Sequence, residues 1–436
     1  MGVWRRVTSA AGARIGVMGV TGLLGIVSSR LILEHFGIDA YAQYGLLNGL
    51  RMLLPFADLG MGAVVLNAIS ESKNPRDDER VLASLATAFR LLVITGLIIA
   101  ALSVLLMVAG LWPAILGNGL MAGGELIATL CIVVFALSLP LGLGSRILVG
   151  SGRNSLQIVI LGLVSPMFVM SLVVLVAIGE SNGSEIALIS YVATSITGLI
   201  CIVVAGRLIQ PALGKAFWRV PRIPRYPSIP IFDTAGPALA ISMATPIAMQ
   251  TDRLFLSHMS DRIELATYNF ASQIFGLVLQ AIIAAGLTLW PFFARARSRG
   301  KVESPFPIAA GFLGAALAMG AALVLAMPLF ETWVAKDLLQ VGGWLMVGYV
   351  ALIAVQSVHY PIGMYMTSPA GLKFQVIPVF AMVASNVLLT WLLVQRLGAA
   401  GPVIASAIAL FVCQVIPAAW WVRRDMKRRR AHADGA

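Results

Sequence analysis

Two full charges interrupt an apolar stretch of the sequence and are its first candidates for chemistry. Residues 50–62 read LRMLLPFADLGMG, so Arg51 and Asp58 lie seven residues apart among side chains that suit lipid. On a helix this spacing puts both on one face, about 10 Å apart along the axis, which is too far for an easy ion pair within the helix. Each side chain is therefore expected to face a partner on another helix, or a ligand.

Further charges lie well inside apolar segments, and the full set is Arg30, Arg51, Asp58, Arg90, Asp252 and Arg253. A charge near the centre of a bilayer costs about 2.5–3.5 kcal/mol on insertion scales, so such groups normally face a watery cavity or a partner. The arginines outnumber the aspartates, and the planar guanidinium group suits two-point binding of phosphate. We therefore predict that these residues form a substrate site for an anion, because a cation site would need surplus carboxylate.

A structural role is open for each of these residues. Arg30 and Arg90 lie near enough to the ends of their apolar segments for the charged group to reach a membrane surface. Asp252 and Arg253 could mark the boundary of a span. Arg51 could join helices as part of an ion pair, and the segment FADLGMG around Asp58 could form a helix bend.

The composition places these charges in a membrane protein. The chain has 436 residues, of which 59% are hydrophobic and 11% charged, and its mean hydropathy is +0.91. The exterior of a soluble protein carries far more charge than this. Apolar runs exceed the roughly 17–25 residues of a spanning helix, and no alternation typical of a barrel strand occurs. We expect an all-α integral membrane fold.

The sequence offers little sign of a metal, a cofactor or a disulfide. Its three cysteines all fall within apolar segments, and its four histidines are scattered without ligand spacing. We therefore predict neither a metal site nor a cofactor.

Apolar runs bounded by Gly, Pro or charge give twelve candidate spans, at residues 14–35, 40–70, 82–112, 125–149, 156–178, 186–208, 230–258, 264–294, 305–333, 341–366, 373–395 and 400–422. The longest connection between them is rich in Pro and Arg and divides the spans into two groups of six. We predict two six-helix halves around a central cavity. The predicted parts are a first half (1–209), a linker (210–229), a second half (230–424) and a basic tail (425–436).

The distribution of Lys and Arg tests this count of spans. With the N-terminus on side one, that side holds 24 of these residues and the other side holds 3, while four lie within spans. A miscounted helix would exchange the sides downstream of the error and destroy the bias. The positive-inside rule then predicts that both termini are cytoplasmic. This topology accounts for the net charge of +12 without a nucleic-acid partner, and it puts Arg30, Arg51 and Arg253 near one level of the cavity.

Short internal matches suggest that the halves arose by duplication. Residues 42–44 (AQY) match 266–268 (ATY), and LPLG at 139–142 matches YPIG at 360–363. A third match joins 183–187 to 401–405, and the offsets drift only from 224 to 218 residues. Two halves of six spans share one orientation, an arrangement in which rocking of one half against the other exposes a central site to either side.

Three segments resemble one known family. HFGIDAYAQYGLLNGLRMLLPFADLGMG (35–62) is similar to the opening of bacterial polysaccharide flippases, including a DLG motif along the second span. TPIAMQTDRLFLSHMSDRIELATYNFASQI (245–274) resembles the start of their second half, with Asp252 inside the span and Tyr268 after the short outer loop. LGAAGPVIASAI (397–408) resembles the start of their last helix. The resemblance is to the O-antigen or exopolysaccharide flippases of the multidrug/oligosaccharidyl-lipid/polysaccharide exporter (MOP) superfamily.

This resemblance implies a function, a location and partners. Such proteins are not enzymes, and they turn an undecaprenyl-diphosphate-linked oligosaccharide from the cytoplasmic to the periplasmic leaflet of the bacterial inner membrane. The cavity arginines of the family correspond to Arg30 and Arg51, with Asp58 beside them as a candidate for coupling to a proton or sodium ion. The expected partners are the lipid-linked oligosaccharide, membrane lipids and that coupling ion. Further arginines early in the first span, often found in lipid II flippases, are missing from residues 15–28, which makes a peptidoglycan precursor less expected.

Two rival functions stay open at the level of sequence. A drug/cation antiporter of the same superfamily would need unpaired acidic groups in the first half, where Asp58 alone is available. A membrane polysaccharide polymerase or ligase usually carries a large periplasmic loop, whereas the longest outer loop here has about twelve residues, at 113–124. The nucleotide-binding pattern GxxxxGKS/T of a primary pump is absent, and no nucleophile constellation stands out.

Overall fold

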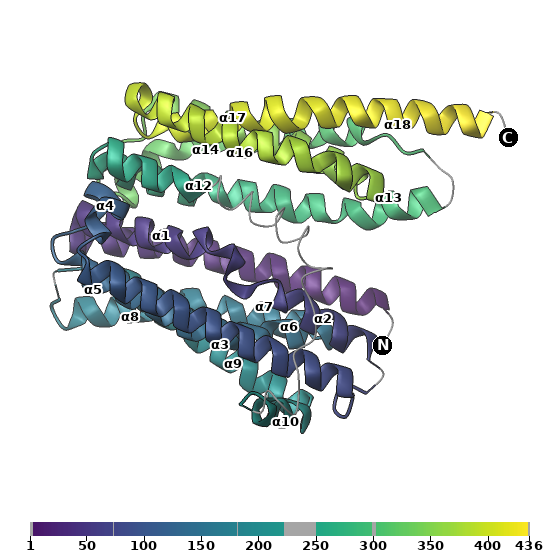
Figure 1. The fold of residues 1–436 in the computed structure, drawn as a ribbon. Coiled ribbons are helices and arrows are strands. Elements are labelled where there is room, and N and C mark those ends of the chain that lie inside the picture. The colour runs from purple at the N-terminus through teal and green to yellow at the C-terminus, as the bar shows by residue number, and fades with distance from the viewer. Residues whose placement is uncertain (1–2, 73, 181, 222–249, 299–301, 435–436) are drawn as a thin grey trace. The chain divides into compact units, whose positions relative to one another are not determined.

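The computed structural model describes residues 3–72, 74–180, 182–221, 250–298 and 302–434 (Figure 1). The secondary structure assigned to these residues is entirely helical. The chain divides into two compact units, unit 1 (Met1–Met243) and unit 2 (Ala244–Ala436). The predicted limits at 209, 229 and 424, and the central cavity between the halves, stay predictions.

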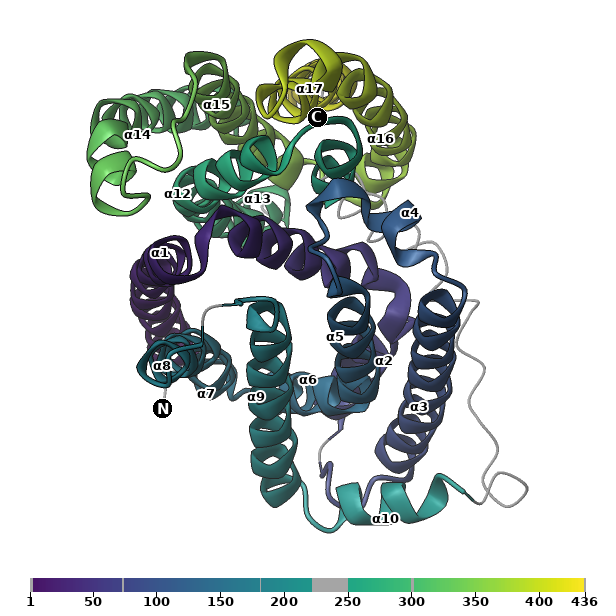
Figure 2. The ribbon, with the colours of Figure 1, turned by 90° about the vertical axis from the view of Figure 1, so that its left-hand side faces the viewer.

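The helices of unit 1 are α1 (Val3–Leu50), α2 (Met61–Glu71), α3 (Glu79–Val108), α4 (Trp112–Leu116), α5 (Gly124–Ser138), α6 (Leu143–Gly150), α7 (Asn154–Gly162), α8 (Val164–Ala177), α9 (Ile186–Leu208) and α10 (Ala212–Arg219). Its short 3-10 turns are η1 (Arg51–Leu53), η2 (Pro55–Asp58), η3 (Gly117–Gly119) and η4 (Leu139–Gly142). Helix α9 contacts α1, α5, α6 and α8 within this unit, and Figure 2 labels these helices.

Unit 2 has a helix whose described part covers residues 250–259. The helices that follow are α12 (Arg262–Leu287), α13 (Leu289–Ser298), α14 (Pro305–Trp333), α15 (Gly343–Tyr365), α16 (Pro369–Leu397), α17 (Ala400–Leu410) and α18 (Ile416–Asp434), with a π-helical turn, η5 (Phe411–Val415), between the last two. Within this unit α16 packs on α17, and α15 packs on α12, α14 and α17.

Ten helices in the described residues are long and apolar enough to cross a membrane. The predicted first span and the start of the second both fall within α1, where Gly37 has a non-helical backbone (φ 82°, ψ −178°). The rest of the predicted second span is broken by η1 and η2 before α2 begins. The predicted seventh span, 230–258, lies mostly outside the described residues. The helical membrane fold is confirmed, and the count of twelve spans stays a prediction.

Glycine allows several helices of unit 1 to pack closely. A Cβ atom added at Gly144 of α6 would lie 2.3 Å from the backbone nitrogen of Ile202 on α9. A Cβ atom at Gly96 of α3 would lie 2.5 Å from the carbonyl oxygen of Ala136 on α5. Small residues at such contacts let helix backbones approach each other within a membrane.

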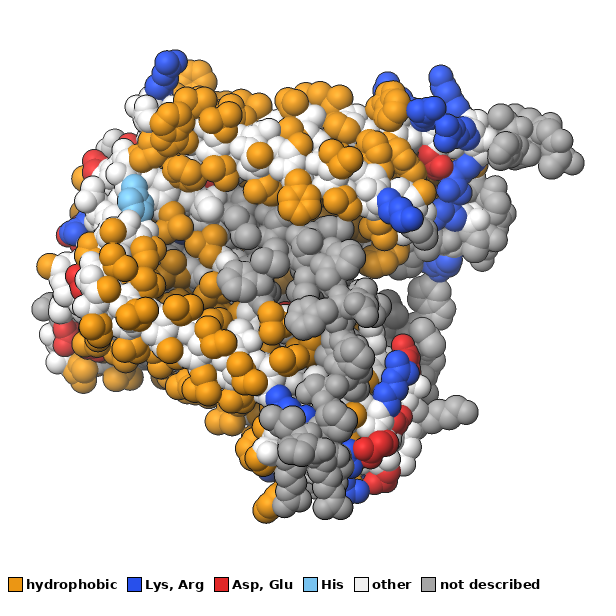
Figure 3. All heavy atoms as spheres, viewed as in Figure 1, with side chains coloured by type: hydrophobic (Ala, Val, Ile, Leu, Met, Phe, Trp, Pro, Cys, Tyr) orange, Lys and Arg blue, Asp and Glu red, His pale blue; other side chains and the backbone are white. Residues whose placement is uncertain are grey.

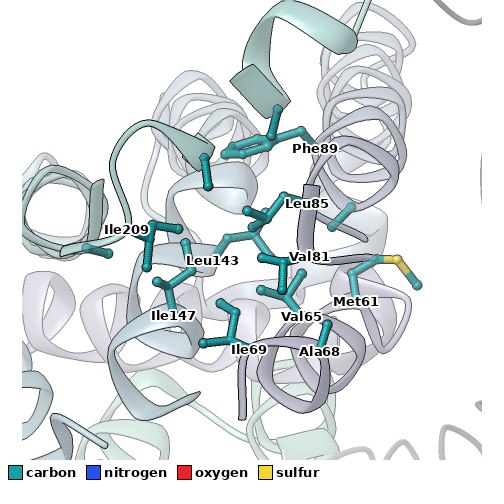
Figure 4. Close-up of a cluster of buried hydrophobic side chains, with 14 of the residues drawn as sticks. Met61, Val65, Ala68, Ile69, Val81, Leu85, Phe89, Leu143, Ile147 and Ile209 are labelled. Atoms are coloured by element: carbon teal, nitrogen blue, oxygen red, sulfur yellow. The ribbon is translucent and has the colours of Figure 1, made fainter. Parts of the chain in front are cut away.

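A buried apolar core holds one end of unit 1 together (Figure 4). Val65 and Ile69 of α2 pack among Val81 of α3 and Ile147 of α6, and Ile209 joins them just beyond α9. These side chains come from four separate segments, so the core fixes how the helices meet at this end.

The surface of each unit has an apolar flank and a charged end, which is mixed in sign in unit 1 and mainly basic in unit 2 (Figure 3). Large side chains such as Leu325, Ile377 and Val108 are 82%, 78% and 76% exposed, which suits contact with lipid. In unit 1, charged side chains gather around α10 and the connection from α2 to α3, and in unit 2 basic ones gather at the ends of α13 and α18 (Figure 3). The cytoplasmic position of these ends follows from the positive-inside rule and stays a prediction.

Candidate functional site

The candidate site of unit 1 is built around a break between α1 and α2. Arg51 begins η1 and Asp58 ends η2, and the next two residues, Leu59 and Gly60, have φ angles of 46° and 72°. The Oδ1 atom of Asp58 accepts a hydrogen bond from the Gly60 backbone N–H at 2.9 Å and so supports the turn. The bend considered for FADLGMG is present. Because the helix is broken here, the expectation that Arg51 and Asp58 share one face of a regular helix is wrong.

Arg51 is held by two residues of α9. Its Nη1 atom donates a hydrogen bond to Thr194 Oγ1 at 2.8 Å, and its Cζ atom lies 5.7 Å from the centroid of the Tyr191 ring. The Tyr191 hydroxyl in turn donates to the carbonyl oxygen of Leu47 at 2.7 Å, just before the break. The ring therefore fixes the chain that carries Arg51 and also faces its guanidinium group.

The charge of Arg51 has no ion-pair partner within the described part of the chain, where the ion pairs join other residues. Its Nε atom is buried and has no hydrogen-bond partner there. The ion pair considered as a structural role for Arg51 is therefore not formed by the described residues. A buried donor without a partner costs free energy, and an anion in contact with it would remove that cost.

Asp58 lies near an arginine that sequence reasoning did not select. A Cβ atom added at Gly62 would lie 2.7 Å from Arg146 Nε and 3.1 Å from Asp58 Oδ2, so both side chains reach the space beside this glycine. Arg146 belongs to α6, within the predicted span 125–149, and was not among the predicted site residues. The sequence LPLG, which forms the turn η4 (Leu139–Gly142), could have indicated this residue, because non-helical backbone within a span is tolerated where it lines a polar cavity.

Arg30 lies on α1 and forms an ion pair within its own helix. Its Nε atom is 3.2 Å from Glu34 Oε2, one turn further along, and the Arg30 side chain is 29% exposed. The positive surplus expected at this position is therefore reduced by a carboxylate that sequence reasoning did not include.

Arg90 is buried and holds the end of α10. It is 5% exposed, and its Nε and Nη2 atoms donate to the carbonyl oxygens of Val220 at 2.9 Å and Arg219 at 2.5 Å. The last carbonyl groups of a helix lack partners within the helix, and a cation is favoured there. These contacts fix the short helix that follows α9, and a substrate role for Arg90 stays a prediction.

Asp252 in unit 2 is buried against α12. The Tyr268 hydroxyl donates to Asp252 Oδ2 at 3.0 Å, whereas Oδ1 is buried without a hydrogen-bond partner in the described residues. Nearby on α15, the Tyr349 ring stacks on Phe275 at 4.9 Å and lies 6.4 Å from the Tyr268 ring.

Arg253, next to Asp252, directs its donors to oxygen atoms of uncharged side chains. Its Nε atom donates to Asn269 Oδ1 at 2.8 Å, and its Nη2 atom donates to Ser272 Oγ at 3.3 Å. Its Nη1 atom donates to Gln250 Oε1 at 2.8 Å. Unit 2 thus contains a polar cluster in which one Asp252 oxygen has no hydrogen-bond partner among the residues that the structure describes.

The structure groups the predicted residues into separate places. Arg51 and Asp58 lie at the break between α1 and α2, and Asp252 and Arg253 lie together in unit 2. The shared level expected for Arg30, Arg51 and Arg253 involves residues of both units and stays a prediction. No group of three or more His, Cys, Asp or Glu residues is placed to hold a metal ion within the described ranges.

The comparisons with known proteins identify the fold. No family model and no curated protein sequence matches the chain. A solved structure of the lipid II flippase MurJ, in an inward closed conformation, aligns with a TM-score of 0.72 and 13% identity, over 95% of this chain and 89% of that one. An inward-facing multidrug resistance MATE family transporter of the MOP superfamily aligns with a TM-score of 0.67 and 16% identity, over 97% and 99% of the two chains. The chain has the fold of MOP-superfamily transporters.

An outward-facing MATE family transporter also aligns, with a TM-score of 0.62 and 15% identity, over 97% of this chain and 95% of that one. At these identities the similarity is one of fold. It agrees with the superfamily expected from the sequence, at the level of a multi-pass membrane protein with a transporter fold.

Proposed function

We propose that this protein is a flippase that moves an undecaprenyl-diphosphate-linked oligosaccharide from the cytoplasmic to the periplasmic leaflet by alternating access. The fold supports this proposal, since similar structures include a lipid II flippase and transporters in inward-facing and outward-facing states. The observation that carries it is Arg51, a guanidinium group in the interior of unit 1 that forms no ion pair with any described residue.

The chemistry of Arg51 suits a diphosphate head group. Thr194 accepts from one Nη atom and the Cζ atom lies 5.7 Å from the centroid of the Tyr191 ring, so the group is oriented, while its buried Nε atom has no hydrogen-bond partner among the described residues. A guanidinium group binds phosphate through two parallel hydrogen bonds, which a lysine cannot form. We assign the first contact with the diphosphate to Arg51, with Arg146 and Arg30 as further positive groups of unit 1.

Release of a tightly held anion requires a coupled change elsewhere. An anion bridged by arginine in a medium of low dielectric constant is held strongly. We propose that a proton or sodium ion drives the change. Asp58, the expected coupling residue, already accepts from Gly60 and lies near Arg146, whereas one buried oxygen of Asp252 has no hydrogen-bond partner in the described ranges.

A drug/cation antiporter is the second candidate, and one observation favours it. The unpartnered oxygen of Asp252 is the kind of group that a cationic substrate needs. Arg253 follows it directly and opposes a second positive charge at this position. We favour the flippase because the unpaired charge of unit 1 is positive.

The test compares two variants of Arg51 with a matched control in a strain that lacks the native gene. We expect Arg51→Ala to lower transport at least about tenfold, since hydrogen bonds to charged groups contribute about 1.5–3 kcal/mol. Arg51→Lys should retain part of the activity. Arg207→Gln, which removes an exposed arginine from the last turn of α9, should behave as wild type. The readout is the accumulation of undecaprenyl-linked intermediates together with surface polysaccharide, at equal amounts of protein in the membrane.

The outcomes separate the two candidate functions. Normal surface polysaccharide in the Arg51→Ala strain would contradict the flippase site. A gene deletion that causes drug sensitivity and leaves lipid-linked intermediates at their normal level would instead support the antiporter.

A further inference from the structure

A polar cleft of about 410 Å³ lies at one end of unit 1, away from the residues discussed above. It is bounded by the end of α2 with the loop that follows, by the turn between α6 and α7, and by the end of α9. Its polar lining includes Ser70, Asn74 and Arg76 on one side and Ser151 and Arg153 on another. Ile69 and Ile209 also line it and belong to the core in Figure 4, so the cleft rests on packed helices.

Three acidic residues near this cleft are paired with cations outside it, and a fourth, Asp78, accepts hydrogen bonds from Ser72 Oγ and the Arg80 N–H. Glu71 forms an ion pair with Arg80 at 2.8 Å, and Asp77 forms one with Lys215 at 3.3 Å. Glu79 pairs with Arg219. Glu71, Asp77 and Glu79 are thus paired with cations that do not line the cleft, and Asp78 is the one carboxylate of the loop that is bound to a lining residue, Ser72.

The two arginines of the cleft keep their charge unpaired. Neither Arg76 nor Arg153 has a carboxylate within 4 Å in the described part of the chain, where the ion pairs join other side chains. Arg76 Nε donates to the carbonyl oxygen of Leu208 at 3.3 Å, which leaves its remaining nitrogens available. The cleft therefore carries a local positive surplus.

Ser151 adds a second, independent observation. Its Oγ atom is buried and has no hydrogen-bond partner among the described residues, although the residue lines the cleft. Buried hydroxyl groups normally have a partner. An acceptor bound in the cleft would supply that partner.

We propose that this cleft binds a phosphate group, either the phosphodiester of an anionic membrane lipid or a soluble phosphate compound. Two guanidinium groups, a buried hydroxyl and the amide of Asn74 match the several acceptor oxygens of phosphate. The site is separate from the proposed transport site, because neither Arg51 nor Asp58 lines it. The proposal therefore stands whether or not the chain is a flippase.

The experiment uses the full-length protein in neutral detergent with two probes. Phosphatidylglycerol retention is measured by native mass spectrometry, and inorganic pyrophosphate binding by titration calorimetry. The variants are the double substitution Arg76→Gln/Arg153→Gln, the single substitution Ser151→Ala and the control Arg207→Gln. The control removes one positive charge from the same end of α9 outside the cleft.

We expect at least one probe to bind wild type and the control with affinities that agree within about twofold. The double variant should bind that probe at least about tenfold more weakly, and Ser151→Ala should weaken it several-fold. Loss of phosphatidylglycerol alone identifies a lipid source, and loss of pyrophosphate alone identifies a soluble source. If the double variant does not fold, Ser151→Ala decides the question, since it leaves all charges in place.

The proposal is overturned if neither probe binds wild type. It is also overturned if the control loses as much affinity as the double variant, because the binding would then depend on total charge and not on the cleft.

Discussion

At the scale of single residues, the arginines predicted to lie within spans have four different kinds of contact in this chain. Arg30 pairs with a carboxylate, Arg90 binds backbone carbonyl groups, and Arg253 binds amide and hydroxyl oxygens. Arg51 contacts a hydroxyl and an aromatic ring and keeps a donor unused. Arginine therefore has a structural role at some of these positions and can bind a ligand at another. The contacts that each guanidinium group makes within the protein distinguish the two roles.

Asp78, at the start of α3, gives a prediction about pH. Ser72 Oγ donates to Asp78 Oδ2 at 2.5 Å and the Arg80 N–H donates to Oδ1 at 2.9 Å. These bonds, that of Ser72 first, hold the pKa of Asp78 below its ordinary value of 3.8. A carboxylate with a lowered pKa stabilises the folded state above the unfolded-state pKa, and its contribution is lost as the pH falls through the folded-state pKa.

Ser72→Ala removes the largest cause of this shift. The pKa of Asp78 should rise toward 3.8, so the first turn of α3 should loosen at a higher pH than in wild type, within the acidic range below about pH 4. Hydrogen exchange at the start of α3, compared at each pH, measures this. The control Asn74→Ala should follow wild type, and identical profiles for Ser72→Ala and wild type would contradict the account.

At the scale of helices, the close contact of α6 with α9 gives a prediction about stability. Gly144→Ala would place a methyl group against the backbone of Ile202, a group that cannot move aside, so we expect a loss of about 1–3 kcal/mol. Gly142→Ala is the control, since no atom lies within 4 Å of its added Cβ and its φ is −57°. Thermal unfolding in detergent compares them. Equal midpoints for the two variants would show that the helices do not pack as described.

The attachment of α10 gives a second prediction at this scale. Arg90→Lys keeps the positive charge but cannot donate from two nitrogens to the carbonyl groups of Arg219 and Val220. Since hydrogen bonds to charged groups contribute about 1.5–3 kcal/mol each, α10 should open more often. Hydrogen exchange over residues 212–220 should quicken, while α5 exchanges as in wild type. Unchanged protection of α10 would mean that other contacts hold it.

Sequence patterns predicted most of the helices but not the break in the second span. Length and hydropathy are enough to find a spanning helix, and ten such helices are present in the described residues. The break depends on the positive φ angles of Leu59 and Gly60 and on the space that Gly62 leaves for Arg146. Pro55 and the DLG motif signalled a bend, but they could not show that the helix stops.

The partners of the candidate site could not be predicted, because they come from helices distant in sequence. Thr194 lies 143 residues after Arg51, and Val220 lies 130 residues after Arg90. An apolar sequence fixes which segments enter the membrane, while the facing of one helix toward another depends on packing. The sequence therefore indicated which charges are costly to bury, but it did not indicate which residues these charges contact.

At the scale of the whole molecule, the fold and the charge of the site support one account. The chain has the fold of transporters solved in inward-facing and outward-facing states, and its two compact units agree with a protein built from two parts. The proposed substrate, a lipid-linked oligosaccharide, rests on the sequence resemblance and on Arg51, whose Nε atom has no hydrogen-bond partner among the described residues.

The central claim is tested most directly by transfer of a lipid-linked oligosaccharide in proteoliposomes. The substrate is first removed from the outer leaflet with a glycosidase, and the sugar that then reaches the outer surface is counted with a lectin. We predict transfer by wild type and by Arg207→Gln well above that of protein-free vesicles, and transfer by Arg51→Ala close to the protein-free level. No transfer by wild type, or equal transfer by wild type and Arg51→Ala, would contradict the account.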